Sequence, residues 1–512
     1  MMEPRVEIAS GRIEGTHEDG VLVFRGIPYA RPPQGELRLR APLPPAAWAG
    51  VRETKAFGAA APQTPGRLAA LLGSPTETYQ EDCLYLNVWT PGAGAARRPV
   101  LVWLHGGAFA TGSGSQPIYR GARLAQRGDA VVVTVNYRLG ALGYLHLPGL
   151  GREAGAASAN FGLLDQLAAL AWVRENIAAF GGDPANITLF GESAGAMSVG
   201  TLLGTPRARG LFARAILQSG AASNVYDRED ALRVAETFMK ELGLAADDVA
   251  GLRAKPLEAV LAAQDRAVAQ LLGVVPQLPF QPVVDGDVLP RPPLTAIAEG
   301  ISREVSVLIG TNLEEQKLYS PTDPKAQSLD DDGLQRRCRR ALPAPGPDGR
   351  PRGEHAIQHY RAAREGRCDV SPRELWYAIE TDRWFRIPAT RLAELQAAHQ
   401  PATYAYLFTW KSPALGGMLG SCHALEIPFV FGCVDDRLVQ RFVGDHPAVA
   451  GISRRMQDAW LAFARTGSPG SSELGDWPRY DAVRRATMLL GEECRVEHAP
   501  FEAERAFWDE AD

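Results

Sequence analysis

The stretch ITLFGESAGAMS, from Ile187 to Ser198, sets one serine between two glycines where strand-forming residues give way to helix-forming residues. A strand that turns sharply into a helix crowds its own backbone, so small residues must flank the turn. The run Gly191 to Gly195 is the only G-x-S-x-G in the chain. It predicts that Ser193 is a nucleophile, with the N–H of Ala194 and the helix dipole behind it. The alternative is a serine that only caps the helix.

Strands and helices alternate on both sides of this turn. Short apolar runs rich in β-branched residues predict buried strands of a parallel sheet. A long helix is expected from Asn160 to Phe180, ending at two glycines. The sequence therefore predicts an α/β fold, with a largely parallel sheet covered by helices on both faces. The predicted strands are Val100 to His105, Ala130 to Tyr137, Asn186 to Phe190, Ala213 to Ser219, Val305 to Asn312 and Ala402 to Trp410.

The segment from Tyr319 to Trp384 interrupts this alternation. It contains turns rich in proline and glycine, charged helical stretches and no convincing buried strand. No internal repeat or low-complexity linker divides the 512 residues. We therefore expect one domain over residues 1–512, with residues 319–384 inserted over the sheet as a cap.

Composition excludes several classes of function. The chain is 46% hydrophobic and 22% charged, with a net charge of −5 and a pI near 6.1, so it is expected to be globular and to have no broad attraction for nucleic acid or anionic lipid. The basic run at 336–340 follows three aspartates at 330–332, which largely cancel its charge. No apolar run reaches the roughly 18 residues that a membrane helix needs. Heavy use of Ala, Arg, Gly and Pro suggests a bacterial genome.

The cysteines do not show metal-ligand spacing. Together with a start that lacks a secretion signal, they favour free thiols in the cytoplasm. The six are Cys83, Cys338, Cys368, Cys422, Cys433 and Cys494.

A serine hydroxyl needs a histidine base, which in this type of fold follows the serine and the acid along the chain. This order excludes the histidines at 17, 105 and 146. The pair His355 and His359 lacks the glutamate of a metalloprotease helix and is read as an exposed helix face. The histidines at 399, 446 and 498 have polar or proline-flanked neighbours and are expected to be solvated. His423 lies on a glycine-rich loop after a predicted strand, where a base can reach Ser193.

The acid that orients the histidine should follow a strand between Ser193 and His423. Glu314 and Glu315 end the strand VLIGTN, and the residues alone do not separate them. Asp285 and Asp287 are alternatives, although PVVDGD resembles a turn.

Backbone donors are needed for the negative charge that develops on the substrate carbonyl oxygen. The run LHGGAF, which includes His105 to Phe109, follows a predicted strand and has small residues whose N–H groups a substrate can approach. It predicts an oxyanion loop.

Over nearly its whole length the sequence resembles the type-B carboxylesterase family of α/β-hydrolases, and within it the bacterial para-nitrobenzyl-type esterases. The resemblance rests on FRGIPYARPPQGELR, EDCLYLNVW, HGGAF, NYRLGALGY, NFGLLDQ, FGGDPANITLFGESAGA, LQSGA and CHALEIPFVFG, in this order.

The resemblance implies roles for individual residues. The nucleophile falls on Ser193, the acid on Glu315 and the base on His423, with Glu314 in place of the usual aspartate and Gln316 in place of a common glycine. The implied oxyanion donors are Gly107, Ala108 and Ala194. The implied function is hydrolysis of small carboxylic esters through an acyl-enzyme, without cofactor or metal, by a protein for which a monomer is favoured.

Two departures from the family affect this reading. Cys83 matches a cysteine that is disulfide-bonded in secreted members, but no cysteine precedes it here. Gly73 stands where cholinesterases have a tryptophan, so recognition of choline by a cation–π contact is unsupported.

Two other functions stay open. One is a catalytically silent adhesion or scaffold protein, against which the intact serine, glutamate and histidine argue. The other is a hydrolase of amides, carbamates or a single natural-product ester, since the same residues serve all of these reactions.

Overall fold

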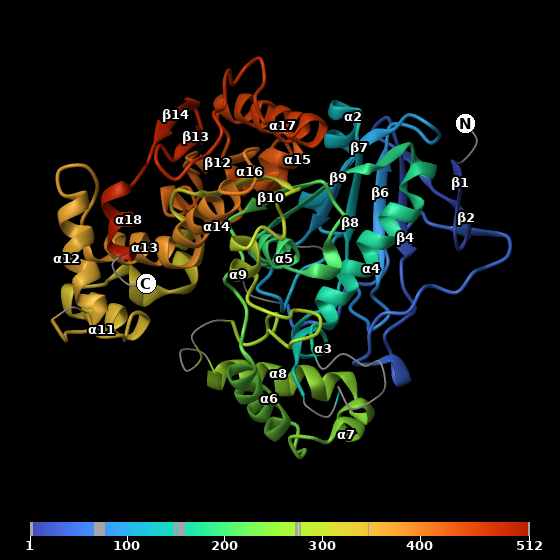
Figure 1. Cartoon of the computed structure of the whole chain (residues 1–512), viewed down its shortest axis with the longest axis horizontal. Helices are drawn as coiled ribbons and strands as arrows, with labels where there is room; N and C mark the ends of the chain where they lie inside the picture. The colour runs from blue at the N-terminus through green and yellow to red at the C-terminus, as the bar shows by residue number, and fades with distance from the viewer. Residues whose placement is uncertain are drawn as a thin grey trace.

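A computed structural model describes residues 4–65, 77–147, 150, 159–271, 275, 278–346 and 348–509. A twisted sheet of 11 strands runs through the molecule, in the order β14-β13-β12-β11-β10-β9-β7-β8-β6-β4-β3 (Figure 1). In chain order its strands are β3 Thr16–Glu18, β4 Val21–Pro28, β6 Tyr85–Thr90, β7 Arg98–Leu104, β8 Val131–Val135, β9 Gly182–Glu192, β10 Arg214–Gln218, β11 Ser306–Asn312, β12 Thr403–Phe408, β13 Ala486–Leu490 and β14 Arg495–His498. A small second sheet contains β1 Arg5–Ile8, β2 Gly11–Glu14 and β5 Val51–Glu53.

The strands β13-β12-β11-β10-β9-β7-β8 of this order are parallel to one another. At the two ends of this set, β14 pairs antiparallel with β13 and β6 pairs antiparallel with β8. The carboxyl ends of parallel strands meet at one edge of a sheet, which is where ligands bind in α/β folds. The loops after β7, β9, β11 and β12 therefore leave from the same edge.

Apolar residues on alternate faces of each central strand build two cores. In β7, Val100, Val102 and Leu104 belong to one cluster, whereas Leu101 and Trp103 belong to the other. Side chains alternate between the faces of a strand, so a strand that is buried on both faces has no polar positions. The expected α/β fold is confirmed.

Helices cover both faces of the sheet (Figure 1). The first core includes α4 Phe161–Asn176, α5 Ala194–Leu203 and α14 Ile387–Ala397. The second includes α2 Ala122–Gly128, α15 Ile427–Phe431 and α17 Ala448–Thr466. The remaining helices outside the insertion are α3 Gly140–Tyr144, α6 Arg228–Glu241, α7 Val249–Ala254, α8 Leu257–Leu271, α9 Pro293–Ala298, α16 Arg437–Val443 and α18 Glu502–Asp509.

The elements expected from the sequence are present with small differences in their ends. The helix expected from Asn160 to Phe180 is α4 followed by a 3₁₀ turn, Ile177–Phe180. It stops at Gly181, whose φ of 80° is the left-handed conformation that glycine adopts readily. Each predicted strand lies in the large sheet.

Residues 319–346 and 348–384 contain helices and no strand. A 3₁₀ helix, Glu315–Thr322, leads into α10 Pro324–Gln327, α11 Asp331–Ala341, α12 Arg352–Arg364 and α13 Pro372–Thr381, and a π-helical turn, Asp382–Arg386, joins α13 to α14. The insertion has a small apolar core of its own, to which α18 contributes Phe507 and Trp508. Figure 1 shows α11, α12 and α18 together at one end of the molecule.

Candidate active site

Ser193 lies at the turn between β9 and α5 with φ 55° and ψ −125°, a backbone conformation that is strained for a residue with a Cβ. Its side chain makes no capping hydrogen bond to α5, so Ser193 is not a helix cap. A Cβ at Gly191 would lie 2.6 Å from the carbonyl carbon of Gly195, and one at Gly195 would lie 2.0 Å from the oxygen of Leu104. Both glycines are therefore required by the close approach of β7, β9 and α5.

The structure brings His423 and Glu315 together from two different loops. His423 Nδ1 lies 2.7 Å from Glu315 Oε2, and its backbone N–H donates to the Glu315 carbonyl at 3.1 Å. Glu315 Oε1 accepts a 2.7 Å hydrogen bond from the N–H of Asn312. Both side chains are buried. Glu315, and not Glu314, is thus the carboxylate that contacts the imidazole.

The second imidazole nitrogen faces the serine turn. His423 Nε2 lies 3.0 Å from Glu192 Oε1 without hydrogen-bond alignment, and it has no hydrogen-bond partner in the described part of the chain. Glu192 is the residue before Ser193. The rings of Phe385 and Tyr319 have their centres 4.6 and 6.5 Å from that of the imidazole. A general base needs an Nε2 that can take up a proton, and the Glu192 carboxylate beside this Nε2 stabilises the protonated imidazole that results.

The loop after β7 packs against the same turn. A Cβ at Gly106 would lie 3.0 Å from the Cβ of Ser193. Gly107 and Ala108 have positive φ values, 113° and 55°. The Gly107 carbonyl turns into its own loop, where it accepts from the N–H groups of Ala110 and Thr111 at 3.0 and 2.9 Å.

Three N–H groups near Ser193 are available to a ligand. Those of Gly107, Ala108 and Ala194 have no hydrogen-bond partner among the residues that the structure describes. Ala194 is the first residue of α5, where the helix leaves its N–H groups unpaired. Backbone donors of this kind stabilise an oxyanion.

A sequence model of the Carboxylesterase family matches residues 2–508. The chain is 40% identical to the para-nitrobenzyl esterase of Bacillus subtilis (strain 168) over 496 residues, 96% of this chain and 95% of the relative. It is 37% identical to the phenmedipham hydrolase of Pseudarthrobacter oxydans over 504 residues, with the same coverage. The crystal structure of the carboxylesterase EST55 of Geobacillus stearothermophilus at pH 6.2 superposes with a TM-score of 0.87 at 42% identity, covering 98% of this chain and 99% of the other.

The chain belongs to the carboxylesterase family. It is a type-B carboxylesterase, a carboxylic ester hydrolase with the α/β-hydrolase fold. The resemblance expected from the sequence motifs is confirmed, as is the reaction class.

The carboxylesterase has a further acid beside its histidine that the sequence argument did not single out. Glu426 is buried, and its two oxygens accept from Gln218 Nε2 at 3.0 Å and Asn312 Nδ2 at 2.6 Å. Burial, together with the negative charges of Glu192 and Glu315, raises the pKa of Glu426 to about 8. Glu426 therefore holds its proton more strongly than an ordinary glutamate does. Its position in CHALE, three residues after the histidine, was the available sequence signal.

The charges around His423 favour its protonated form. Burial by itself lowers the pKa of the imidazole, but the charge of Glu192, with contributions from Tyr319 and the hydrogen bond to Glu315, raises this pKa well above its usual value. Glu192 therefore affects the pH at which His423 can act as a base, a role that the sequence argument missed although Glu192 lies inside the G-x-S-x-G run.

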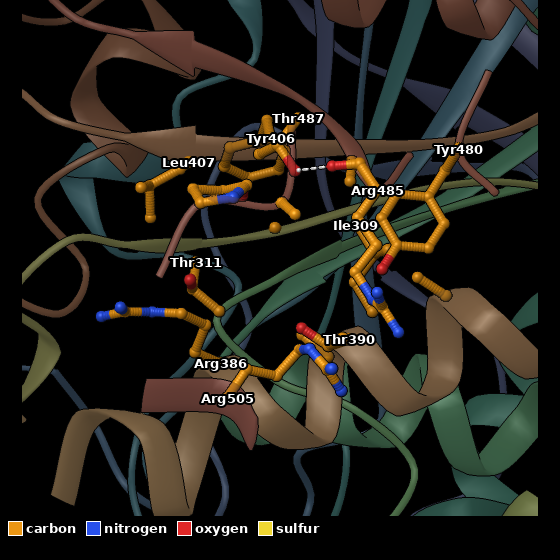
Figure 2. A pocket seen from close by; sticks show the side chains of 16 residues that line it. Ile309, Thr311, Arg386, Thr390, Tyr406, Leu407, Tyr480, Arg485, Thr487 and Arg505 are labelled. Atoms are coloured by element: carbon orange, nitrogen blue, oxygen red, sulfur yellow. Dashed lines mark hydrogen bonds between the residues drawn. The ribbon is translucent and has the colours of Figure 1, made fainter. Parts of the chain in front are cut away.

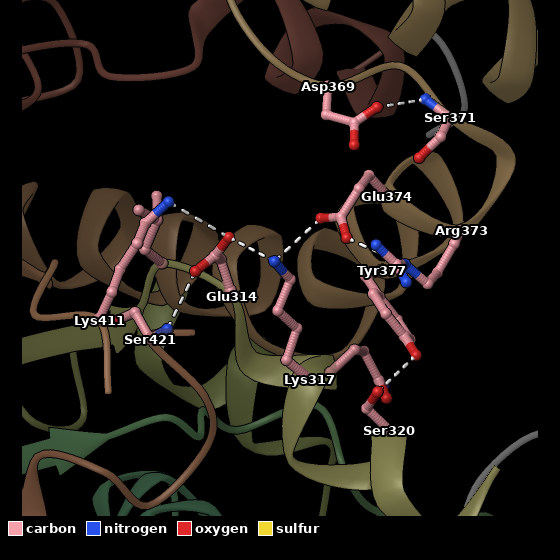
Figure 3. A network of polar contacts seen from close by, with 12 residues as sticks. Glu314, Lys317, Ser320, Asp369, Ser371, Arg373, Glu374, Tyr377, Lys411 and Ser421 are labelled. Atoms are coloured by element: carbon pink, nitrogen blue, oxygen red, sulfur yellow. Dashed lines mark hydrogen bonds and ion pairs between the residues drawn. The ribbon is translucent and has the colours of Figure 1, made fainter. Parts of the chain in front are cut away.

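Glu314 joins the acid loop to the histidine loop (Figure 3). Its Oε2 accepts from the N–H of Ser421 at 2.9 Å, and its own N–H donates to the Ser421 carbonyl at 2.9 Å. Lys317 Nζ lies 2.8 Å from Glu314 Oε1 and 3.0 Å from Glu374 Oε2. Burial opposes ionisation of Glu314, but the charge and hydrogen bond of Lys317, the N–H of Ser421 and the charge of Lys411 together outweigh it and lower the pKa of Glu314. Glu314 thus remains a charged structural link and does not face His423.

The alternative acid and the other histidines have different surroundings. Asp285 accepts from the N–H groups of Asp287 and Leu289, so it closes a turn. His355 and His359 are half-buried in α12 and contact Asp348 and the Ala503 carbonyl, so the exposed face expected for them is only partly present. The histidines at 399, 446 and 498 are exposed, as expected.

No group of His, Cys, Asp and Glu in the described residues could hold a metal ion.

A cavity under β11 and β12 lies apart from Ser193 and His423 (Figure 2). Three arginines line it, and each has a carboxylate partner: Arg386 with Asp382, Arg485 with Glu394, and Arg505 with Glu502. Neither Ser193 nor His423 lines this cavity, so it is separate from the candidate active site.

All six cysteines are free, and burial raises the pKa of Cys83. Position 73, where the cholinesterase tryptophan is absent, lies outside the described residues. None of the helices in the described segments is both long and apolar enough to span a bilayer.

Proposed function

We propose that Ser193 is the nucleophile, His423 the base and Glu315 the acid of this carboxylesterase. His423 Nε2 takes the proton from Ser193 Oγ as the oxygen attacks the ester carbonyl carbon. Glu315 holds Nδ1 protonated, which leaves Nε2 as the basic nitrogen, and it stabilises the imidazolium that forms. The observation that carries this proposal is the 2.7 Å contact between His423 Nδ1 and Glu315, with Nε2 turned toward the serine turn.

The negative oxygen of the tetrahedral intermediate is held by the N–H groups of Gly107, Ala108 and Ala194. Their lack of other partners in the described residues and their position around Ser193 support this role. Collapse of the intermediate returns the proton from His423 to the leaving alcohol and gives an acyl-Ser193 ester. Water, deprotonated by His423, then releases the acid through a second tetrahedral intermediate. These steps need no cofactor or metal.

The substrate is a small carboxylic ester. The relatives' names, para-nitrobenzyl esterase and phenmedipham hydrolase, indicate activity on small aromatic compounds, and we extend that class to this chain. Residues 1–512 form one domain, in which the insertion at 319–384 caps the site. The Tyr319 ring, 6.5 Å from that of His423, supports this role because Tyr319 is the first residue of the insertion.

We also propose a monomeric cytoplasmic enzyme. Six free thiols suit a reducing compartment. The large apolar side chains exposed in the described residues are few, and apart from Leu415 and Met418 they come from separate segments, as is usual on the surface of a monomer. They are Leu43, Val51, Tyr319, Leu415, Met418, Leu438 and Val483. Sedimentation equilibrium of the purified chain would test the monomer.

Titration with an organophosphate tests the site. We expect one equivalent to abolish esterase activity and mass spectrometry to place the adduct on Ser193. A panel of aryl and alkyl esters, an anilide and a carbamate then defines the substrate class. An adduct on another residue would overturn the assignment of the nucleophile.

A further inference from the structure

Gln63 makes hydrogen bonds on both sides of one residue in the loop after β7. Its Oε1 accepts from the N–H of Gly112 at 2.7 Å, and its Nε2 donates to the Gly112 carbonyl at 2.9 Å. Nε2 also donates to the Ala61 carbonyl at 2.9 Å. Gln63 is buried and comes from the segment between β5 and β6, 49 residues before Gly112. Only a carboxamide side chain presents a donor and an acceptor side by side in this way.

Gly112 in turn lies against the first residues of the oxyanion loop. A Cβ on Gly112 would lie 2.5 Å from the Gly106 carbonyl oxygen and 2.6 Å from His105 Nδ1, so the two ends of the loop are in direct backbone contact. Gly112 also has a φ of 105°, which only glycine adopts without strain. The end of the loop at Gly112, where Gln63 binds, therefore lies against the start of the loop at His105 and Gly106.

The other end of the loop has a separate anchor. Tyr137 Oη donates to the His105 carbonyl at 2.5 Å, and the two rings stack with centres 4.5 Å apart. Tyr137 holds the start of the loop and Gln63 holds its end. Gly107 and Ala108, whose positive φ values direct their N–H groups, lie between these two anchors.

We propose that Gln63 is a positioning residue for the oxyanion hole. Its paired hydrogen bonds fix Gly112, and Gly112 holds the turn in which Gly107 and Ala108 present their N–H groups to the developing oxyanion. This inference rests on the proposed function, in which those groups are the oxyanion donors. A neutral amide suits the position, because a carboxylate there would repel the Gly112 carbonyl and place negative charge near that of the transition state.

The test replaces Gln63 by leucine, which keeps the bulk and removes all three hydrogen bonds. We expect Gln63→Leu to lower kcat about 10- to 100-fold with KM within about threefold, because the loss of a whole oxyanion donor costs about 10²- to 10³-fold and a displaced donor costs less. The affinity for a trifluoromethyl ketone, which forms a tetrahedral oxyanion adduct with a serine, should fall by a similar factor. Substitution of a residue that contributes only to stability would leave the affinity for the ketone unchanged.

Gln396 provides the matched control. It is also buried, and its Nε2 donates to the carbonyls of Ser302 and Val305 at 3.0 and 2.8 Å, which belong to a different part of the chain from the loop at 105–112. Gln396→Leu should lower the melting temperature but leave kcat and ketone affinity unchanged. Gln63→Glu, which keeps the shape and the acceptor for Gly112, should fold and lose kcat at least tenfold.

The outcomes separate this inference from the proposed function. If folded Gln63→Leu and Gln63→Glu both keep kcat and ketone affinity within twofold of wild type, the role of Gln63 is wrong. If wild type itself binds the ketone no better than the matching methyl ketone, or if Ser193→Ala is active, the proposed site is wrong. Losses in Gln396→Leu as large as those in Gln63→Leu would also overturn the inference.

Discussion

The active site has two sides that act through different physical means. On the side of the β7 loop and the start of α5, the groups are backbone N–H donors, and glycines at 106, 107 and 112 permit the close packing that aims them. On the other side, the groups are the imidazole of His423 and three buried acidic side chains, which are Glu192 at the end of β9, Glu315 after β11 and Glu426 after His423. The first side therefore depends on the shape of the backbone, and the second depends on charge. Substitutions that disturb the backbone should therefore affect the first side, and substitutions that remove a charge should affect the second.

Ser193 lies between the two sides, and its removal should have the largest effect. Ser193→Ala should fold normally, because the hydroxyl makes no capping bond to α5. Hydrolysis of a simple aryl ester should fall at least about a thousandfold, because the covalent step needs the hydroxyl. Circular dichroism checks the fold. More than a few per cent of wild-type turnover would show that the nucleophile is elsewhere.

The charge-dependent side should separate two neighbouring glutamates. Glu315→Gln should lower kcat about 10³-fold or more, because only Glu315 holds the imidazole in the required tautomer. Glu314→Gln should lower it less than about tenfold, since an amide oxygen can still accept from Ser421 and only the ion pairs with Lys317 and Lys411 are lost. Steady-state kinetics of the two variants decide this. Equal losses, or a larger loss at Glu314, would contradict it.

The shape-dependent side makes a prediction about the alcohol part of the substrate. The Gly107 carbonyl is held inside its loop by Ala110 and Thr111, so it does not take up space beside Ser193. The resemblance of this G-G-A loop to that of family members implies a pocket that accepts esters of tertiary alcohols, and we expect such a pocket here. Hydrolysis of tert-butyl or linalyl acetate should be measurable, though slower than that of a primary acetate.

The measurement is product release from a tertiary acetate by wild type and by Ser193→Ala in parallel. If wild type, while active on primary acetates, is no faster than the variant on a tertiary one, the inference from the loop is wrong.

The smallest effect concerns pH. Because the pKa of His423 is raised, its basic form is lost at a pH above the reference histidine pKa of about 6.5. The acid limb of kcat/KM should therefore lie above that pH. Glu192→Gln removes the charge that favours the imidazolium, so the midpoint of this limb should move to lower pH. The control is Glu314→Gln, whose charge is compensated by Lys317 and whose midpoint should stay in place.

Profiles of kcat/KM from pH 5 to 9 measure the midpoint of the acid limb in wild type and in each variant. A wild-type rate that stays flat down to pH 5, or a midpoint that moves upward in Glu192→Gln, would show that His423 or its electrostatic partner is misassigned.

Sequence reasoning was most successful where a residue is constrained by its neighbours in the chain. The turn at Ser193 requires glycines two residues away on each side, and this local requirement is visible in the sequence. The same applies to the strands that are buried on both faces, which appear as unbroken apolar runs. The spacing could not separate Glu314 from Glu315, because both follow β11 and only the packing of the histidine loop decides which one faces the imidazole.

The residues that were missed act through contacts with distant segments. Glu426 depends on Gln218 and Asn312, and Gln63 depends on Gly112, 49 residues away. Hydrogen bonds of this kind leave no periodicity and no turn signature, since neither partner constrains the residues next to it.

The sequence by itself determined the α/β class, the order of the strands along the chain, the strained serine turn and, through the family motifs, the type of reaction. The residues alone left Glu314 and Glu315 open and the family resemblance favoured Glu315, whereas only the tertiary structure showed the contact of Glu315 with His423, the burial that raises the pKa of Glu426, and the way the oxyanion loop is closed. The physical reason is that strand and turn formation depend on residues a few positions apart, whereas pKa values and the alignment of donors depend on burial and on charges that folding brings together.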